Sequence, residues 1–229
     1  LFDHDDVMHP SLLFECVKTV CEKDADYVYT DEATFTSPNL DDLIVLHFKP
    51  DYSPDNLRAN NYICHFFVVR REIAEKTGGL RPEYNGAQDY DYIFRCTEMA
   101  GKIVHIPRVL YHWRVHSAST ADNPASKLYA YEAGKKAIEG NLARCGEEGT
   151  VTLRSDYGFY DVDYKLRGTP LVSILIPNKD QADTLRTCLE SIKKKCMYPS
   201  YEILIIENNS TEEATFSYYK AVSYTHLTL

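Results

Sequence analysis

The sequence predicts an α/β fold in which buried strands alternate with amphipathic helices. Residues 171–177 and residues 201–206 are nearly continuous apolar runs, which are typical of strands covered on both faces of a parallel sheet. Between them, residues 182–195 carry apolar side chains with the period of a helix. The three segments make one βαβ unit, whose ligand is expected at the carboxyl ends of the strands.

The first 150 residues continue this alternation with shorter elements. Apolar residues at helical spacing, with capping residues or glycines at the ends, mark the helices. Together with the helix near the C-terminus, the predicted helices cover residues 11–23, 71–77, 88–100, 126–145 and 211–220. The predicted strands of this region cover residues 27–29, 62–70, 103–106 and 109–115. Pro107 is expected to separate the last two.

Four regions are expected along the chain. Residues 1–150 are assigned to a first domain, residues 151–168 to a strand-prone linker and residues 169–220 to a second domain. Residues 221–229 are expected to be an artefactual tail, because they end in a string that resembles translated sequencing-adapter sequence. The chain begins with Leu1 rather than Met, so a truncated chain is expected.

The composition is that of a globular protein with a buried core. Hydrophobic residues make up 44% and charged residues 26% of the chain. The net charge of -9 argues against a nucleic-acid partner, because phosphate binding needs a basic surface. Seven irregularly spaced cysteines without a C-x-x-C motif indicate reduced thiols.

An acidic cluster, Asp3-His4-Asp5-Asp6, opens the chain. Its carboxylates repel one another, and a divalent cation such as Mg²⁺ or Mn²⁺ would offset that repulsion and bridge to phosphate oxygens. The alternative is an acidic loop that is simply solvated.

A second acidic motif, Gln88-Asp89-Tyr90-Asp91, opens the predicted helix 88–100. One interpretation of Asp89 is an ordinary carboxylate at the positive end of a helix. The other is a general base that takes a proton from an acceptor hydroxyl.

The segment 111–117 places His112, Arg114 and His116 on one face if it is a strand. We expect Arg114 to clamp a diphosphate with His112 beside it, and His116 or His112 to offer a nitrogen ligand to a metal.

Polar residues also follow the two buried strands of the second domain. Asn178 follows the first strand and Glu207 the second, so both are expected in one crevice. Glu207 is expected to accept hydrogen bonds from a ribose or a base, unless it merely belongs to a polar turn.

Taken together, these motifs resemble the family 2 glycosyltransferases of GT-A fold, and in particular the tandem-domain bacterial type that builds surface polysaccharide. The resemblance is carried in order by Asp3-His4-Asp5-Asp6, Tyr29-Thr30-Asp31-Glu32, the segment 48–54, Gln88-Asp89-Tyr90-Asp91, the segment 111–120 and the strand 172–177. It implies a GT-A-like, Rossmann-related mixed sheet with flanking helices. Residues 1–150 would be the metal- and acceptor-binding half of one domain, and residues 169–220 the nucleotide-binding half of the next.

The resemblance also implies roles for individual residues. Asp3 and Asp5 would hold Mg²⁺ or Mn²⁺ on the donor diphosphate, and His116 would be a late metal or phosphate ligand with Arg114 beside it. Asp89 would be the catalytic base. In the second domain Pro177, Asn178 and Glu207 would line the nucleotide pocket. The chain departs from the family pattern at Gln88, where an acid is frequent, and at Glu207, where Asp is more frequent.

The implied activity is an inverting transfer of a sugar from a nucleoside-diphosphate sugar to a glycan or lipid-linked acceptor. Because each half-domain would lack its complement, the isolated chain is expected to show no turnover. The cytosolic origin of such donors, the reduced thiols and the lack of an export signal predict a cytoplasmic protein, with peripheral association at the inner membrane face as a further expectation.

Three other interpretations stay open at this point. The chain would be a non-catalytic sugar-nucleotide or glycan-binding module if its motifs serve only folding and binding. A metal-dependent phosphohydrolase would use the acidic cluster for water attack, but it leaves residues 111–120 without a role. A structural scaffold would explain the core but not the acidic cluster.

Overall fold

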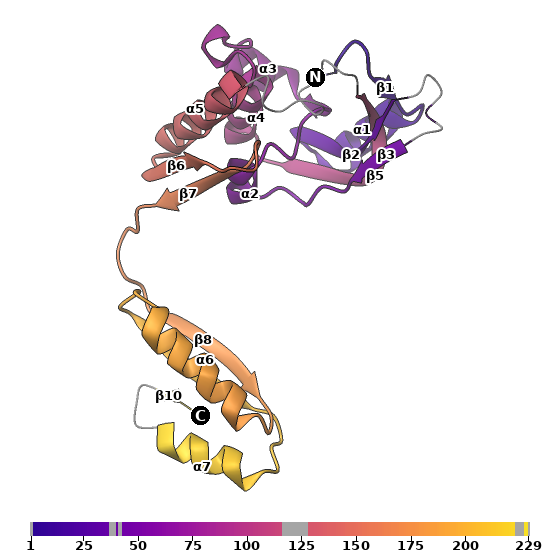
Figure 1. Cartoon of the computed structure of the whole chain (residues 1–229). Coiled ribbons are helices and arrows are strands. Elements are labelled where there is room, and N and C mark those ends of the chain that lie inside the picture. The colour runs from indigo at the N-terminus through magenta and orange to yellow at the C-terminus, as the bar shows by residue number, and fades with distance from the viewer. Residues whose placement is uncertain (1, 37–39, 41–42, 116–127, 223–226, 229) are drawn as a thin grey trace. The chain divides into compact units, whose positions relative to one another are not determined.

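The computed structural model describes residues 2–36, 40, 43–115, 128–222 and 227–228. The chain forms two compact units, Leu1–Lys165 and Leu166–Leu229, which we call the first and second unit. Figure 1 shows a sheet with flanking helices in the first unit and strands with two helices in the second. The predicted α/β fold with a mixed sheet and flanking helices is confirmed.

The first unit is organised around strand β2 (Tyr27–Phe35), whose nine residues are all buried. In this sheet the strands run in the order β1-β5-β2-β3, and β4 also pairs with β2. Strand β5 (Ile103–Arg114) is parallel to β2. The antiparallel members are β1 (Val7–Met8), β3 (Leu43–His47) and β4 (Phe67–Val69). Such a central strand needs buried side chains on both faces, which Tyr27 to Phe35 provide.

Two predicted strands differ from the observed ones. The strand expected over residues 62–70 is confined to Phe67–Val69, because the carbonyls of Ile63 and Cys64 instead accept hydrogen bonds from Lys49 Nζ at 3.0 Å each. The two strands expected on either side of Pro107 are one strand, β5. The register against β2 shifts at this point, so the proline fits within an irregular stretch of the ladder.

Four helices of the first unit form close to their predicted positions: α1 (Leu12–Lys23), α3 (Arg71–Thr77), α4 (Gln88–Met99) and α5 (Leu128–Cys145). Helix α2 (Pro54–Ala59) and the 3₁₀ turn η1 (Pro82–Tyr84) were not predicted. Helices α4 and α5 pack against each other and bury Ile93, Phe94 and Ile138 in the larger core. Helix α1 covers a second core with Leu12 and Cys16.

Of residues 151–168, the stretch predicted to be a linker, residues 151–165 belong to the first unit. Strands β6 (Gly149–Leu153) and β7 (Tyr160–Tyr164) form an antiparallel hairpin. Val151 and Tyr160 are buried in the same core as α4 and α5. The Tyr160 hydroxyl approaches Gly134 of α5, where an added Cβ would lie 2.1 Å from it. Tyr160 of the hairpin therefore packs on α5.

A buried ion pair joins three segments of the first unit. Lys49 Nζ lies 2.8 Å from Glu32 Oε2, and both side chains are about 95% buried, with 3% and 5% exposed. Glu32 also contacts His47 Nδ1 at 3.1 Å and accepts a bond from the backbone N–H of His65. Burial alone would raise the pKa of Glu32, but the hydrogen bonds from His47 and Lys49 outweigh it and hold the pKa below its ordinary value.

The second unit is a parallel sheet with helices on one face. Its elements are β8 (Val172–Asn178), α6 (Ala182–Lys195), β9 (Tyr201–Glu207), α7 (Glu213–Val222) and β10 (Leu227–Thr228), and the strand order is β10-β9-β8. Leu185, Leu189 and Ile205 form its core with Tyr219. Helix α7 continues to Val222, two residues into the stretch expected to be an artefactual tail.

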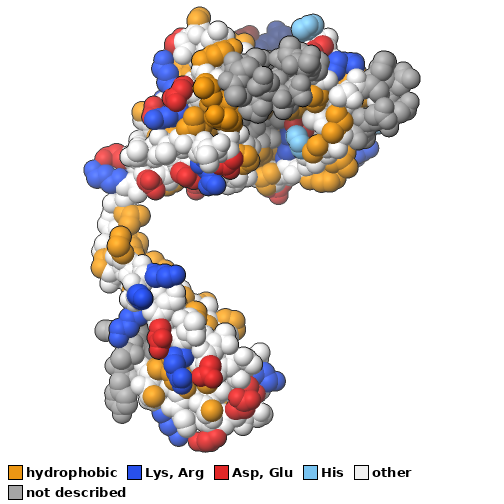
Figure 2. All heavy atoms as spheres, viewed as in Figure 1, with side chains coloured by type: hydrophobic (Ala, Val, Ile, Leu, Met, Phe, Trp, Pro, Cys, Tyr) orange, Lys and Arg blue, Asp and Glu red, His pale blue; other side chains and the backbone are white. Residues whose placement is uncertain are grey.

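Acidic and basic side chains are interspersed on the face of each unit seen in Figure 2. Among the exposed ion pairs of the first unit are Arg154 with Asp156, and Lys165 with Glu148. Among the described helices, none combines the length and the apolar character that crossing a membrane would require.

The buried ion pair generates a stability prediction. Replacing Glu32 by Ala strands a buried ammonium group, and removing one partner of such a pair costs about 3–5 kcal/mol. Fluorescence of Trp113, the one tryptophan of the chain, reports unfolding of the first unit in urea. Glu148→Ala is the matched control, because the Glu148–Lys165 pair is about 70% exposed and is expected to change stability little.

The same pair predicts a pH dependence. Because the folded pKa of Glu32 is lowered, its stabilisation is present above the ordinary glutamate pKa and is lost as the pH falls through the folded value. The stability difference between wild type and Glu32→Ala should therefore narrow in acid. A difference that is small at neutral pH, or that grows in acid, would contradict this account.

Candidate active site

The first unit encloses a cavity of about 880 Å³ between the sheet, the start of α4, the start of α5 and the hairpin. Its walls come from segments that lie far apart in the chain. The lining residues are Asp3, Glu32, 47–50, 60–62, Cys64, His65, Leu80, 85–90, Trp113, 129–131, Gly134 and 158–160. Of the residues predicted from the two acidic motifs, Asp3 and Asp89 both line this cavity. A concave site with convergent polar groups among aromatic rings is the usual form of a ligand-binding pocket.

Asp89 stands in the first turn of α4, where the helix dipole favours a carboxylate. The turn before it is held by Gln88, whose Oε1 accepts a bond from the backbone N–H of Gly86 at 2.8 Å. Gly86 adopts a φ of 94°, which other residues rarely take. Asn61 Nδ2 donates to Asp89 Oδ2 at 3.0 Å. Asn61 thus orients the Asp89 side chain, which lines the cavity.

Asp91 has a different environment, although it lies only two residues away. Its side chain is fully buried and forms ion pairs with Arg81 and with Arg95, the latter at 2.9 Å. These contacts fasten α4 to the segment before it. Asp91 is therefore a structural residue, and Asp89 is the carboxylate of this motif that lines the cavity.

The acidic cluster is divided in the same way. Asp6 is buried, and it accepts hydrogen bonds from the Tyr111 hydroxyl and from the Arg114 backbone N–H, the latter at 2.7 Å. Burial raises the pKa of Asp6 and these bonds oppose the rise. The Asp3 side chain is 52% exposed, with an oxygen 3.8 Å from His65 Nδ1. Asp3 thus presents its carboxylate to the cavity, while Asp6 ties the cluster to β5.

The donor set suits a hard divalent cation better than a soft one. Asp3 and Asp5 offer carboxylate oxygens, which Mg²⁺ and Mn²⁺ prefer. Within the part of the chain that the structure describes, however, no group of three or more His, Cys, Asp and Glu side chains is arranged to hold a metal ion. His116, the third predicted ligand, lies outside the described residues.

The other predicted residues of β5 have contacts away from the cavity lining. Arg114 Nε donates to the Asp5 carbonyl at 2.7 Å, and its guanidinium stacks on Phe35 at 4.4 Å. His112 is buried, and its Nδ1 has no hydrogen-bond partner among the residues that the structure describes. Burial lowers the pKa of His112. Trp113, which alternates with these two residues along the strand, is the one that lines the cavity.

Several lining residues were not predicted from the sequence. Glu32, His47, Lys49 and His65 form a polar part of the wall, where the ion pair described above holds them. Asn61 was missed as well, because an isolated Asn beside a predicted strand carries no pattern. Burial, together with the nearby Asp89, raises the pKa of the Cys64 thiol, so this lining residue is protonated near neutral pH.

In the second unit, two of the predicted nucleotide residues meet at the strand ends. Asn178 Nδ2 donates to the Tyr219 hydroxyl at 2.7 Å, and that hydroxyl donates to Glu207 Oε2 at 2.8 Å. The backbone N–H and hydroxyl of Ser210 also bind Glu207 and lower its pKa. Pro177 is exposed beside them. The carboxyl ends of β8 and β9 therefore bring Asn178 and Glu207 together, as their register requires.

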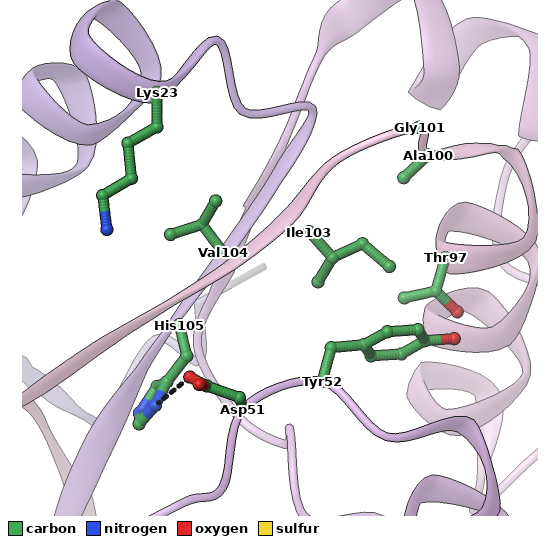
Figure 3. Close-up of a pocket in the computed structure, with 9 residues that line it drawn as sticks. All are labelled: Lys23, Asp51, Tyr52, Thr97, Ala100, Gly101, Ile103, Val104 and His105. Atoms are coloured by element: carbon green, nitrogen blue, oxygen red, sulfur yellow. Dashed lines mark ion pairs between the residues drawn. The ribbon is translucent and has the colours of Figure 1, made fainter.

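A further hollow of about 500 Å³ lies over another part of the first unit. Figure 3 shows Lys23, Tyr52 and Val104 around it, and His105 paired with Asp51 at 3.6 Å. His105 Nε2 also lies 2.8 Å from Asp31 Oδ1, within the sheet. This hollow lacks the residues of the two acidic motifs, so we do not assign the chemistry to it.

Known proteins match both the whole chain and its second unit. The family model described as Glycosyl transferase family 2 matches residues 173–226. The O-antigen biosynthesis protein RfbC of Myxococcus xanthus is 40% identical over 214 residues, which are 93% of this chain and 16% of that protein. The uncharacterized protein y4gI of Sinorhizobium fredii is 38% identical over 223 residues, which are 96% of this chain and 24% of that protein.

The chain therefore spans about a sixth and about a quarter of the lengths of these two relatives. The similarity to each relative runs through both units, whereas the family model covers the strands and helices of the second. Together, the family match within the second unit and the similarity of both units to the O-antigen biosynthesis protein support a family 2 glycosyltransferase.

Proposed function

We propose that the first unit provides the acceptor and base side of an inverting, metal-dependent sugar transfer from a nucleoside-diphosphate sugar. The observation that carries this proposal is the convergence of Asp3 and Asp89 on one cavity, from residues 86 positions apart in the chain. The acceptor class is a glycan or a lipid-linked sugar. Cell-surface polysaccharide synthesis is the proposed process, and the similarity to an O-antigen biosynthesis protein supports it.

In the proposed reaction, Asp89 removes the proton of an acceptor hydroxyl. The hydroxyl oxygen forms a bond to the anomeric carbon of the donor sugar, and the bond from that carbon to the diphosphate breaks on the opposite face. The proton stays on Asp89 and the electron pair leaves with the nucleoside diphosphate. One base suffices for this single displacement, and Asn61 holds its carboxylate in place.

The diphosphate side of the site is proposed from the acidic cluster. Asp3 and Asp5 would hold Mg²⁺ or Mn²⁺, with His116 as a third ligand, and the bound ion would stabilise negative charge on the leaving diphosphate. A role for Arg114 and His112 at the diphosphate stays a prediction. The contacts of Arg114 with the Asp5 carbonyl and with Asp6 support a second role, which is to hold the acidic cluster in shape.

The second unit is proposed to bind the nucleoside part of a donor at the ends of β8 and β9. Glu207 would accept a hydrogen bond from the nucleoside, with Asn178 and Pro177 beside it. Support comes from the lowered pKa of Glu207, which keeps an ionised acceptor at this edge of the sheet. We assign this nucleotide to a second transferase site, distinct from the one formed by the first unit. Residues 1–150 and 169–220 would then belong to successive transferase domains.

The base assignment predicts a large loss of turnover on Asp89→Asn. This isosteric change keeps the size of the side chain but removes its basicity, so sugar transfer should fall by about 10²–10⁴-fold. The assay measures nucleoside diphosphate release from UDP-, GDP- and dTDP-sugars by the longest natural polypeptide that contains this chain. Glu72→Gln is the matched control, because Glu72 is an exposed first-turn acid of α3 outside the cavity.

Full turnover by Asp89→Asn would overturn the assignment and favour a non-catalytic sugar-nucleotide or glycan-binding module. Equal losses in both variants would point to damage to the fold, which thermal unfolding of each variant detects.

The nucleotide assignment predicts weaker binding of nucleoside diphosphates to Glu207→Gln. Loss of a charged acceptor should weaken the complex about tenfold. Titration calorimetry of the chain with UDP, GDP and dTDP measures this. Glu202→Gln on the same strand is the control, because Glu202 sits at the opposite end of β9 and accepts a bond from Ser173. Unchanged affinity in Glu207→Gln would remove Glu207 from the site.

A further inference from the structure

We propose that Tyr129 and Phe159 form a binding site for a sugar ring of the acceptor, directly beside Asp89. This inference rests on the proposed role of Asp89 as the base, and it assigns the acceptor to a chemical class and to specific side chains. Both aromatic residues line the cavity. Both side chains are also exposed, at 56% and 46%.

Tyr129 lies against the loop that presents Asp89. It stands in the first turn of α5, and a Cβ added to Gly86 would come within 2.7 Å of its Cε2 atom. Gly86 precedes Asp89 by three residues and is held in that turn by Gln88. The ring therefore packs directly on the Gly86 turn that leads into α4, while more than half of the side chain stays accessible.

Phe159 is linked to Asp89 through the segment 60–61. An isolated antiparallel bridge pairs Phe159 with Asn60, and Asn60 Nδ2 donates to the Gly158 carbonyl at 3.0 Å. The next residue, Asn61, is the one that hydrogen-bonds Asp89. Both rings are thus connected to the proposed base through a single intervening segment.

The hairpin that carries Phe159 and the start of α5 that carries Tyr129 are fastened to each other without a ligand. The Tyr160 hydroxyl donates to the Tyr131 carbonyl at 3.0 Å, which ties the hairpin to α5. The Tyr131 ring in turn stacks on Tyr157 with centroids 5.1 Å apart. A preorganised surface loses little conformational freedom on binding, which suits a weakly held ligand such as a sugar.

The chemistry of the wall matches a sugar better than a lipid chain. A pyranose presents C–H groups on its faces, which pack on aromatic rings, and hydroxyl groups around its edge, which need hydrogen-bond partners. The side chains of Asp89 and His65 line the cavity and are only partly buried, so they can pair with the hydroxyl groups of a sugar. An acyl chain would instead desolvate the Asp89 carboxylate in the same cavity without compensation.

The test is saturation-transfer NMR on the 229-residue chain with methyl glycosides of glucose, galactose, mannose and rhamnose as probes. We expect transfer from the protein to the ring protons of at least one glycoside, and loss of most of that transfer in Tyr129→Ala and in Phe159→Ala. Tyr129→Phe should keep it, because the ring remains. Phe14→Ala is the matched control, because Phe14 is 66% exposed on α1 and lies outside the cavity lining.

No transfer to any of the four glycosides would overturn the proposal, as would transfer that persists in both alanine variants. Thermal unfolding of each variant separates loss of the site from loss of the fold, and retained signal in Tyr129→Phe does so independently. The outcome is also separable from that of the base assignment, because sugar binding should survive Asp89→Asn while turnover should not. If Asp89→Asn abolishes turnover and no glycoside binds, the base assignment stands and this inference fails.

Discussion

The architecture of the first unit depends on one buried ion pair, that of Lys49 with Glu32. Lys49 extends from the segment after β3 into the sheet, where its ammonium group meets the Glu32 carboxylate and the carbonyls of Ile63 and Cys64. These three oxygen contacts satisfy the three N–H donors of the buried ammonium, which is what it needs to be tolerated. The same contacts shape the segment that carries Asn61 and His65, and hence one wall of the cavity. The buried Lys49–Glu32 pair thus fixes the position of one wall of the cavity.

In the two acidic motifs, the carboxylates have two different environments. In each, one carboxylate is buried in hydrogen bonds or ion pairs and another is left at the cavity. Asp6 binds Tyr111 and the backbone of Arg114, and Asp91 binds two arginines. Asp3 and Asp89 then face the cavity from anchored segments. Preorganised groups of this kind need little rearrangement to act on a substrate.

The regular elements could be predicted because their apolar periodicity is local. Helices α1, α3 and α4, and strands β8 and β9, appear within a residue or two of the expected bounds. The misses have non-local causes. The segment 62–66 does not pair in the sheet, because the Lys49 ammonium donates hydrogen bonds to the carbonyls of Ile63 and Cys64. Residues 151–165 belong to the first unit because Tyr160 packs against Gly134 of α5.

The site was predictable to a similar extent. Acidic residues such as Asp3 and Asp89 stand out in a sequence because their types and spacing carry chemistry. Asn61, Trp113 and Tyr129 do not, since only the folded chain shows that they line the same cavity. The strand pattern placed His112 and Arg114 on one face, but it could not show which face the cavity would occupy.

The hairpin β6–β7 bears on how such enzymes can be divided and recombined. Because Phe159 and Tyr160 belong to the first unit although they come just before the second, a boundary drawn after residue 150 would remove one wall of the cavity and open its core. A boundary after Lys165 keeps both units whole. Residues 151–165, the fifteen residues between those two boundaries, contribute to the cavity wall but do not include α4, which carries Asp89. They could be exchanged as one segment. Grafting it between related enzymes is a compact way to vary the cavity wall while leaving α4 unchanged.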